Sequence, residues 1–196
     1  MTQKNLNHVQ QDQGMLLRGL LALVRNIGGL IEDRMRIQKA AYLLQSLGAT
    51  DFHPATFRYH CYGPYSRELS NELHNAVLCG LLEEITKPDF QDPKSYRYRL
   101  TEAGEKWLSS AQSTLSSMFP PDEMRKKMEI IKKEDSERLE LAATIVFLLK
   151  QHKGLLTPKQ ALDKALDLKS YSSSSNGNIL HTLNDLGFFE NMQLSA

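Results

Sequence analysis

Hydrophobic periodicity changes between helical and alternating patterns several times along residues 14–108, and this order constrains the fold more than any other feature. Helical spacing gives way to a short alternating segment, returns, and is followed by two extended segments and another helix. The predicted helices cover 14–26, 34–47, 66–79 and 102–117, and the predicted extended segments cover 56–62, 81–86 and 95–100. Two strands directly after a third helix predict a winged helix, that is, a helix-turn-helix core carrying a β-hairpin.

Capping residues and glycines support these helix boundaries. Gly28 and Gly29 end the first helix, Asp33 can cap the second, and Thr101 is well placed to cap the helix after the hairpin. Gly63 and Pro64 are expected to form a turn that sets the angle of the third helix, with Tyr62 and Tyr65 clamping the turn to the core.

The last third of the chain is predicted to be helical. MRKKMEIIKKEDSERLE predicts a charged, solvated helix, and Leu139–Leu149 predicts a buried one. Thr157, Pro158 and Gln160 form a helix start with a capping box. The predicted organisation is a flexible tail over 1–13, a winged-helix domain over 14–118, a charged linker helix over 119–137 and a C-terminal helical lobe over 138–196.

Two stretches of the sequence resemble each other. Leu73-His74 is followed by Gly80-Leu81-Leu82-Glu83, and Leu180-His181 is followed at the same spacing by Gly187-Phe188-Phe189-Glu190. We favour an internal repeat, although any two short helical hairpins could match this well. The fold class is therefore mainly α with a small β-hairpin (α+β): a winged helix-turn-helix and a second helical lobe, helix-turn-helix-like and without room for a full wing.

Composition excludes several classes of protein. The 196 residues carry a formal net charge of +1, which gives no global signature of binding to nucleic acid or anionic membranes. No apolar run is long enough to span a bilayer, and the polar N-terminus lacks the apolar core of a signal peptide. Because Cys61 and Cys79 are the only cysteines, we expect a cytoplasmic protein with reduced thiols and no membrane partner.

The motifs from Arg36 to Gly104 resemble a known family. Arg36-Ile37-Gln38-Lys39-Ala40-Ala41-Tyr42-Leu43-Leu44 precedes Phe57-x-Tyr59, Tyr62-Gly63-Pro64-Tyr65-Ser66-x-Glu68-Leu69 and Tyr98-Arg99-Leu100-Thr101-x-x-Gly104. This pattern is similar to the YwgA-like family of bacterial and archaeal proteins and, more distantly, to the Panacea (SocA-like) antitoxin domain. The resemblance implies a small prokaryotic protein and brings no catalytic residues with it.

The outward face of the third helix is the candidate DNA-reading surface, since in a winged helix this helix enters the major groove. Side chains suited to base edges or phosphates lie on it, on the preceding helix and on the hairpin. The candidate nucleic-acid-binding residues are Arg34, Arg36, Lys39, Arg67, Asn71, His74, Asn75, Lys94, Arg97 and Arg99. We thus expect a non-enzymatic transcriptional regulator that binds double-stranded DNA, as a homodimer.

Other residues of the same face favour a protein partner. Glu68 and Glu72 would repel phosphate, and Leu78 is an apolar side chain on an outward position, where a partner protein could cover it. The alternative is therefore an antitoxin-like module that neutralises or masks a partner protein through Leu78.

Metal and catalytic chemistry are not indicated. His60, Cys61, His74 and Cys79 contain suitable atoms, but their spacing matches no structural zinc pattern. Ser66 has no motif around it that would mark a nucleophile. We expect no enzyme, no metal and no cofactor.

Overall fold

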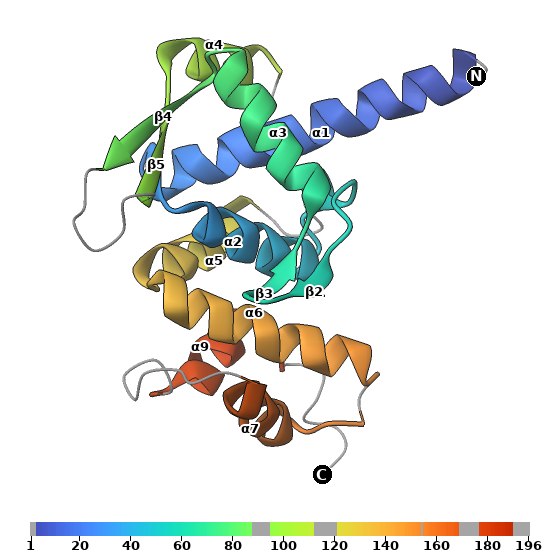
Figure 1. Cartoon of the computed structure of the whole chain (residues 1–196), viewed down its shortest axis with the longest axis vertical. Helices are drawn as coiled ribbons and strands as arrows, with labels where there is room; N and C mark the ends of the chain where they lie inside the picture. Colours follow the sequence, from blue (N-terminus) through green and yellow to red (C-terminus); the bar gives the residue numbers. More distant parts are fainter. Residues whose placement is uncertain (1–2, 88–94, 112–120, 154, 169–176, 190–196) are drawn as a thin grey trace.

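The computed structural model describes residues 3–87, 95–111, 121–153, 155–168 and 177–189. Helices dominate, with a small antiparallel sheet, as the predicted α+β class requires (Figure 1). The helices are α1 Gln3–Ile27, α2 Arg34–Ser46, α3 Arg67–Leu78, α4 Glu102–Ser110, α5 Pro121–Lys133, α6 Ser136–Gln151, α7 Pro158–Leu168 and α9 Ile179–Asp185, with a 3₁₀ turn, η1, at Thr50–Phe52. The strands are β1 Leu30–Glu32, β2 Arg58–His60, β3 Gly63–Tyr65, β4 Leu82–Lys87 and β5 Ser95–Leu100.

The first helix is longer than the sequence pattern indicated. Residues 3–13 were expected to be part of a flexible tail, but α1 begins at Gln3, and its first turns project away from the rest of the molecule in Figure 1. The apolar periodicity begins only after Gly14, which is why the tail was predicted. The second half of α1 is buried between α3, α4 and α5.

A three-stranded sheet has the order β1-β5-β4 and contains a strand that the sequence did not reveal. β4 and β5 form the expected hairpin, with Leu82 opposite Leu100, and β1 pairs with β5, with Leu30 opposite Arg99. Gly29, at φ 80°, ends α1, and Asp33 caps α2 by accepting a hydrogen bond from the Met35 N–H at 2.6 Å. Only three residues remain between them for β1, too few to give an alternating pattern.

β2 and β3 form a second small hairpin, which corrects the predicted turn. Gly63 and Pro64 belong to β3, where they lie opposite His60 and Tyr59. The turn therefore falls two residues earlier, at Cys61 and Tyr62. The expected clamp is also wrong, because Tyr62 is 62% exposed and Tyr65 is exposed.

One hydrophobic core runs through both predicted lobes. α6 packs against α2 on one side and against α7 and α9 on the other, as Figure 1 shows. α5 was expected to be solvated, but it contacts α1 and α9 and buries Met124, Lys127, Met128 and Ile131. The Lys127 ammonium donates to the Leu186 carbonyl at 2.6 Å, at the end of α9.

The start of α7 and the ends of α3 and α9 match the sequence signals. Thr157 and Gln160 each accept a hydrogen bond from the other's backbone N–H, at 3.2 and 2.9 Å, which confirms the capping box. Gly80, at φ 68°, and Gly187, at φ 91°, end α3 and α9 with the same pair of backbone hydrogen bonds. The two similar stretches therefore end in the same local geometry.

Candidate interaction surface around α3

The strand before α3 is held by two polar side chains of α2. The Gln38 amide donates to the Ser66 carbonyl and accepts from the Ser66 N–H, both at 2.9 Å. All of these atoms are buried, so each bond satisfies a backbone group that water cannot reach. The Gln-Lys and Tyr-Gly-Pro-Tyr-Ser motifs are thus two halves of one structural contact.

Lys39 belongs to this contact and not to a phosphate-binding surface. Its side chain is only 2% exposed, and its ammonium donates to the Pro64 carbonyl at 2.8 Å. The expectation that Lys39 meets DNA is therefore wrong. Glu140 and Thr144 of α6 are buried in the same region, and both lie beside Gly63 together with the Lys39 side chain.

Ser66 and Glu68 fix the first turn of α3. The Ser66 hydroxyl accepts from the Leu69 N–H at 3.3 Å and donates to the Glu68 carboxylate at 2.7 Å. The same carboxylate accepts from the Thr56 N–H at 3.3 Å. Although burial works in the opposite direction, these bonds hold the pKa of Glu68 below its ordinary value.

The two faces of α3 lie as the helical period predicted. Leu69, Leu73 and Ala76 are buried. The outward side chains are Arg67, Asn71, His74, Asn75 and Leu78, and all of them are exposed. Leu78 is the most apolar of them and is 71% exposed. Glu72, expected on this face, is instead buried, and burial raises its pKa.

The arginines near the sheet are all engaged by carboxylates. Arg97 pairs with Glu32 at 2.6 Å and Arg99 with Glu83 at 3.2 Å. Arg34 pairs with Glu84 at 2.9 Å, donates to the Tyr98 hydroxyl and lies 4.5 Å above the Tyr96 ring. These pairs largely cancel the positive charge that the sequence suggested for the hairpin.

Arg36 and Lys94 complete the predicted set. Arg36 donates to the Lys132 carbonyl at 2.7 Å, so it ties α2 to α5. Lys94 lies outside the described residues.

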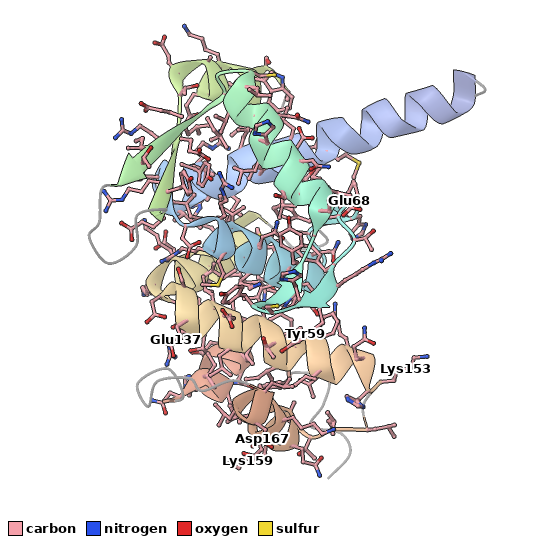
Figure 2. The ribbon with its side chains drawn as sticks, in the orientation of Figure 1. Tyr59, Glu68, Glu137, Lys153, Lys159 and Asp167 are labelled. Atoms are coloured by element: carbon pink, nitrogen blue, oxygen red, sulfur yellow. The ribbon has the colours of Figure 1, made fainter. Side chains whose placement is uncertain are left out.

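A groove of about 440 Å³ lies between the β2–β3 hairpin and the start of α3. Its lining residues are Thr56, Arg58, Tyr59, His60, Tyr65, Arg67 and Glu68. In Figure 2, Tyr59 is labelled beside α6 and Glu68 at the first turn of α3. Of these residues, the sequence pattern gave only Arg67 as a candidate for binding. The hairpin side chains join it only through the unexpected pairing of β2 with β3.

A smaller hollow of about 250 Å³ lies between α3 and the sheet. Its lining residues are Arg34, Ser70, Asn71, Leu73, His74, Glu84 and Tyr98. The Tyr98 hydroxyl donates to Glu84 at 2.6 Å and accepts from Arg34. Burial, with the Glu84 bond, raises the pKa of Tyr98. Arg34, Glu84 and Tyr98 therefore satisfy one another in this hollow.

The described residues contain neither a metal-binding cluster nor a membrane-spanning helix. Among the described residues, no three histidine, cysteine or acidic side chains gather where they could hold a metal ion. No helix in the described ranges combines the length and apolar character needed to cross a bilayer. Cys61 and Cys79 are both exposed and free thiols.

Comparison with known proteins supports the resemblance seen in the motifs. The chain is 28% identical over 151 residues to the uncharacterized protein YwgA of Bacillus subtilis (strain 168), an alignment covering 76% of this chain and 81% of that protein. No model of a protein family matches the chain. The similarity to YwgA-like proteins is thus confirmed, and the more distant similarity to the Panacea domain stays a prediction.

Proposed function

We propose that the protein is a non-enzymatic, cytoplasmic interaction module that binds and masks a partner protein with the surface formed by α3 and the β2–β3 hairpin. The observations that carry this proposal are the exposure of Leu78, at the end of α3, and of Tyr62, in the β2–β3 turn. The arginines of the β4–β5 hairpin, in contrast, are already paired with carboxylates. Tyrosine and arginine are enriched in protein–protein interfaces, and a charge introduced at an exposed apolar position such as Leu78 tests whether a partner covers it. The predicted resemblance to an antitoxin domain agrees with this role.

A pull-down from a lysate of the source organism, with the full chain as bait, tests the proposal. Leu78→Asp should abolish capture of the partner and leave the melting temperature unchanged, because the side chain is exposed. Leu168→Asp is the matched control: Leu168 is 53% exposed on α7, away from α3, and its change should leave capture intact. Capture that survives Leu78→Asp would contradict the proposal.

DNA binding as a winged-helix homodimer is the second candidate. It is supported by the order β1-β5-β4 beside three helices and by the exposed polar face of α3. It predicts affinity for duplex DNA that falls steeply with salt and is lost in Arg67→Ala and Arg97→Ala. Absence of duplex binding at low salt, measured by fluorescence anisotropy, would reject it.

A further inference from the structure

The groove between β2–β3 and α3 has an excess of positive charge. Arg58 and Arg67 line it, and within the described ranges neither guanidinium makes a hydrogen bond or a close ion pair. Both residues are exposed. Among the residues that line the groove, two arginines therefore accompany one carboxylate, that of Glu68.

Glu68 is poorly placed to neutralise these arginines. Its carboxylate accepts hydrogen bonds from the Ser66 hydroxyl and the Thr56 N–H, which hold it against the first turn of α3. Arg58 acts on it only at a distance, as the weakest of the influences that lower its pKa. The arginine donors thus remain available to an anion from outside.

Aromatic rings form the walls of the groove. The rings of His60 and Tyr65 lie 5.6 Å apart, and the Tyr59 ring lies 5.6 Å from that of Phe147 in α6. Both tyrosines are partly exposed. Such rings provide contact area at a small cost in side-chain entropy, which is why tyrosine is common in binding surfaces.

The groove is held in shape by the buried contacts behind it. Gln38 binds Ser66 through both of its backbone groups, and Lys39 binds the Pro64 carbonyl. Because β3 is already fixed in this way, the groove loses little conformational entropy when a ligand binds. The affinity is therefore not reduced by the cost of ordering the groove.

We propose that this groove binds a glutamate or aspartate side chain, presented by an extended acidic segment of the partner protein, through Arg58 and Arg67. The inference rests on the proposed interaction function and specifies the chemistry of the partner. A peptide fits better than duplex DNA, because the arginines near the three-stranded sheet are already paired with Glu32, Glu83 and Glu84. A duplex presents a continuous track of phosphates and requires many free cations to meet it.

The test is an NMR titration of the full chain with a short peptide of alternating glutamate and tyrosine. We expect saturable shifts of the amides of residues 56–68, and binding at least about tenfold weaker for the same peptide with glutamine in place of glutamate. Arg58→Gln and Arg67→Gln should each weaken binding to a similar extent, by about tenfold. Arg125→Gln, on the exposed side of α5, is the matched control and should leave it unchanged.

Two results of the titration would overturn the inference. The first is no saturable shift in residues 56–68 with the glutamate peptide, and the second is unchanged binding in the double variant Arg58→Gln/Arg67→Gln. If a short DNA duplex shifts these amides and the peptide does not, the ligand is a nucleic acid. Partner capture that resists the double variant but is lost in Leu78→Asp would reject this groove and keep the proposed function.

Discussion

Gly63 occupies a position that a larger residue can take only with strain. Its φ is 76°, and a Cβ added there would lie 2.8 Å from the Thr144 hydroxyl oxygen, which is buried. Gly63→Ala therefore combines an unfavourable backbone conformation with a clash against α6. We expect a loss of about 2–4 kcal/mol in the free energy of unfolding, measured by urea denaturation.

Gly80→Ala separates these two costs. Gly80 also has a positive φ, 68°, but nothing lies within 4 Å of an added Cβ. The Gly80→Ala variant should therefore lose only about 1 kcal/mol in the free energy of unfolding, which is the cost of the left-handed backbone conformation. Equal losses in the two variants would show that the approach of α6 to Gly63 costs nothing.

Glu72 makes stability depend on pH. Burial raises its pKa above the unfolded value, so the folded state holds the proton more tightly and the charged form opposes folding. This penalty is full above the folded pKa and disappears as the pH falls below the unfolded value of about 4.3. Glu72→Gln should therefore raise the unfolding free energy at pH 7, by less than about 1 kcal/mol, and give no gain at low pH.

Urea denaturation at neutral and at acid pH measures this effect. Glu129→Gln is the control, because Glu129 is exposed on α5 and pairs only weakly with Lys132, at 4.0 Å. If Glu72→Gln raises the unfolding free energy as much at acid pH as at neutral pH, the penalty does not come from the charged Glu72 carboxylate.

Periodicity alone identified most of the exposed residues of α3 but not the role of every charged residue. Leu69, Leu73 and Ala76 are buried, and Arg67 and Asn71 are exposed, because the helical period decides both. Lys39 and Glu72 are buried for reasons outside their own helices. The partner of Lys39 is a carbonyl 25 residues away in sequence, and no local pattern predicts such a contact.

At the scale of elements, the Tyr98 hydroxyl of β5 links β4 to the start of α2. It donates to Glu84 of β4 and accepts from Arg34, which follows β1. Tyr98→Phe leaves the ring in place and removes both bonds. We expect a loss of about 1–2 kcal/mol in thermal or urea unfolding.

Tyr96→Phe is the matched control in the same strand. It keeps the ring that lies under the Arg34 guanidinium, so it should change stability by less than about 0.5 kcal/mol. If the two variants are equally stable, the hydrogen bonds of Tyr98 contribute nothing net.

Long elements were predictable and very short ones were not. α2, α3, α6 and the β4–β5 hairpin have clear periods and follow the sequence prediction. β1 and β3 contain three residues each, and their pairing with β5 and β2 depends on contacts distant in space. The groove was missed for the same reason, because it exists only once β3 is paired.

At the scale of the whole molecule, α6 is central. It is buried on nearly all sides, between α2 and the pair α7 and α9, and its low amphipathicity in the sequence agrees with this. The prediction of a lobe over residues 138–196 uses the two prolines at 120 and 121 and the charged run after them, and neither signal reports that α6 packs against α2. The Gln38–Lys39 contact with β3 lies against this same helix, so the candidate surface depends on it.

A shared core predicts that the chain unfolds in one transition. Trp107 of α4 is the single tryptophan, so its fluorescence reports on the part around α1, while far-UV circular dichroism reports on all helices. Leu141→Ala in α6 creates a cavity and should cost about 2–4 kcal/mol. Since Leu141 is fully buried in the common core, both signals should move to the same lower urea midpoint. Leu168→Ala, exposed on α7, should move neither. A fluorescence midpoint that stays unchanged in Leu141→Ala would show that the two parts unfold independently.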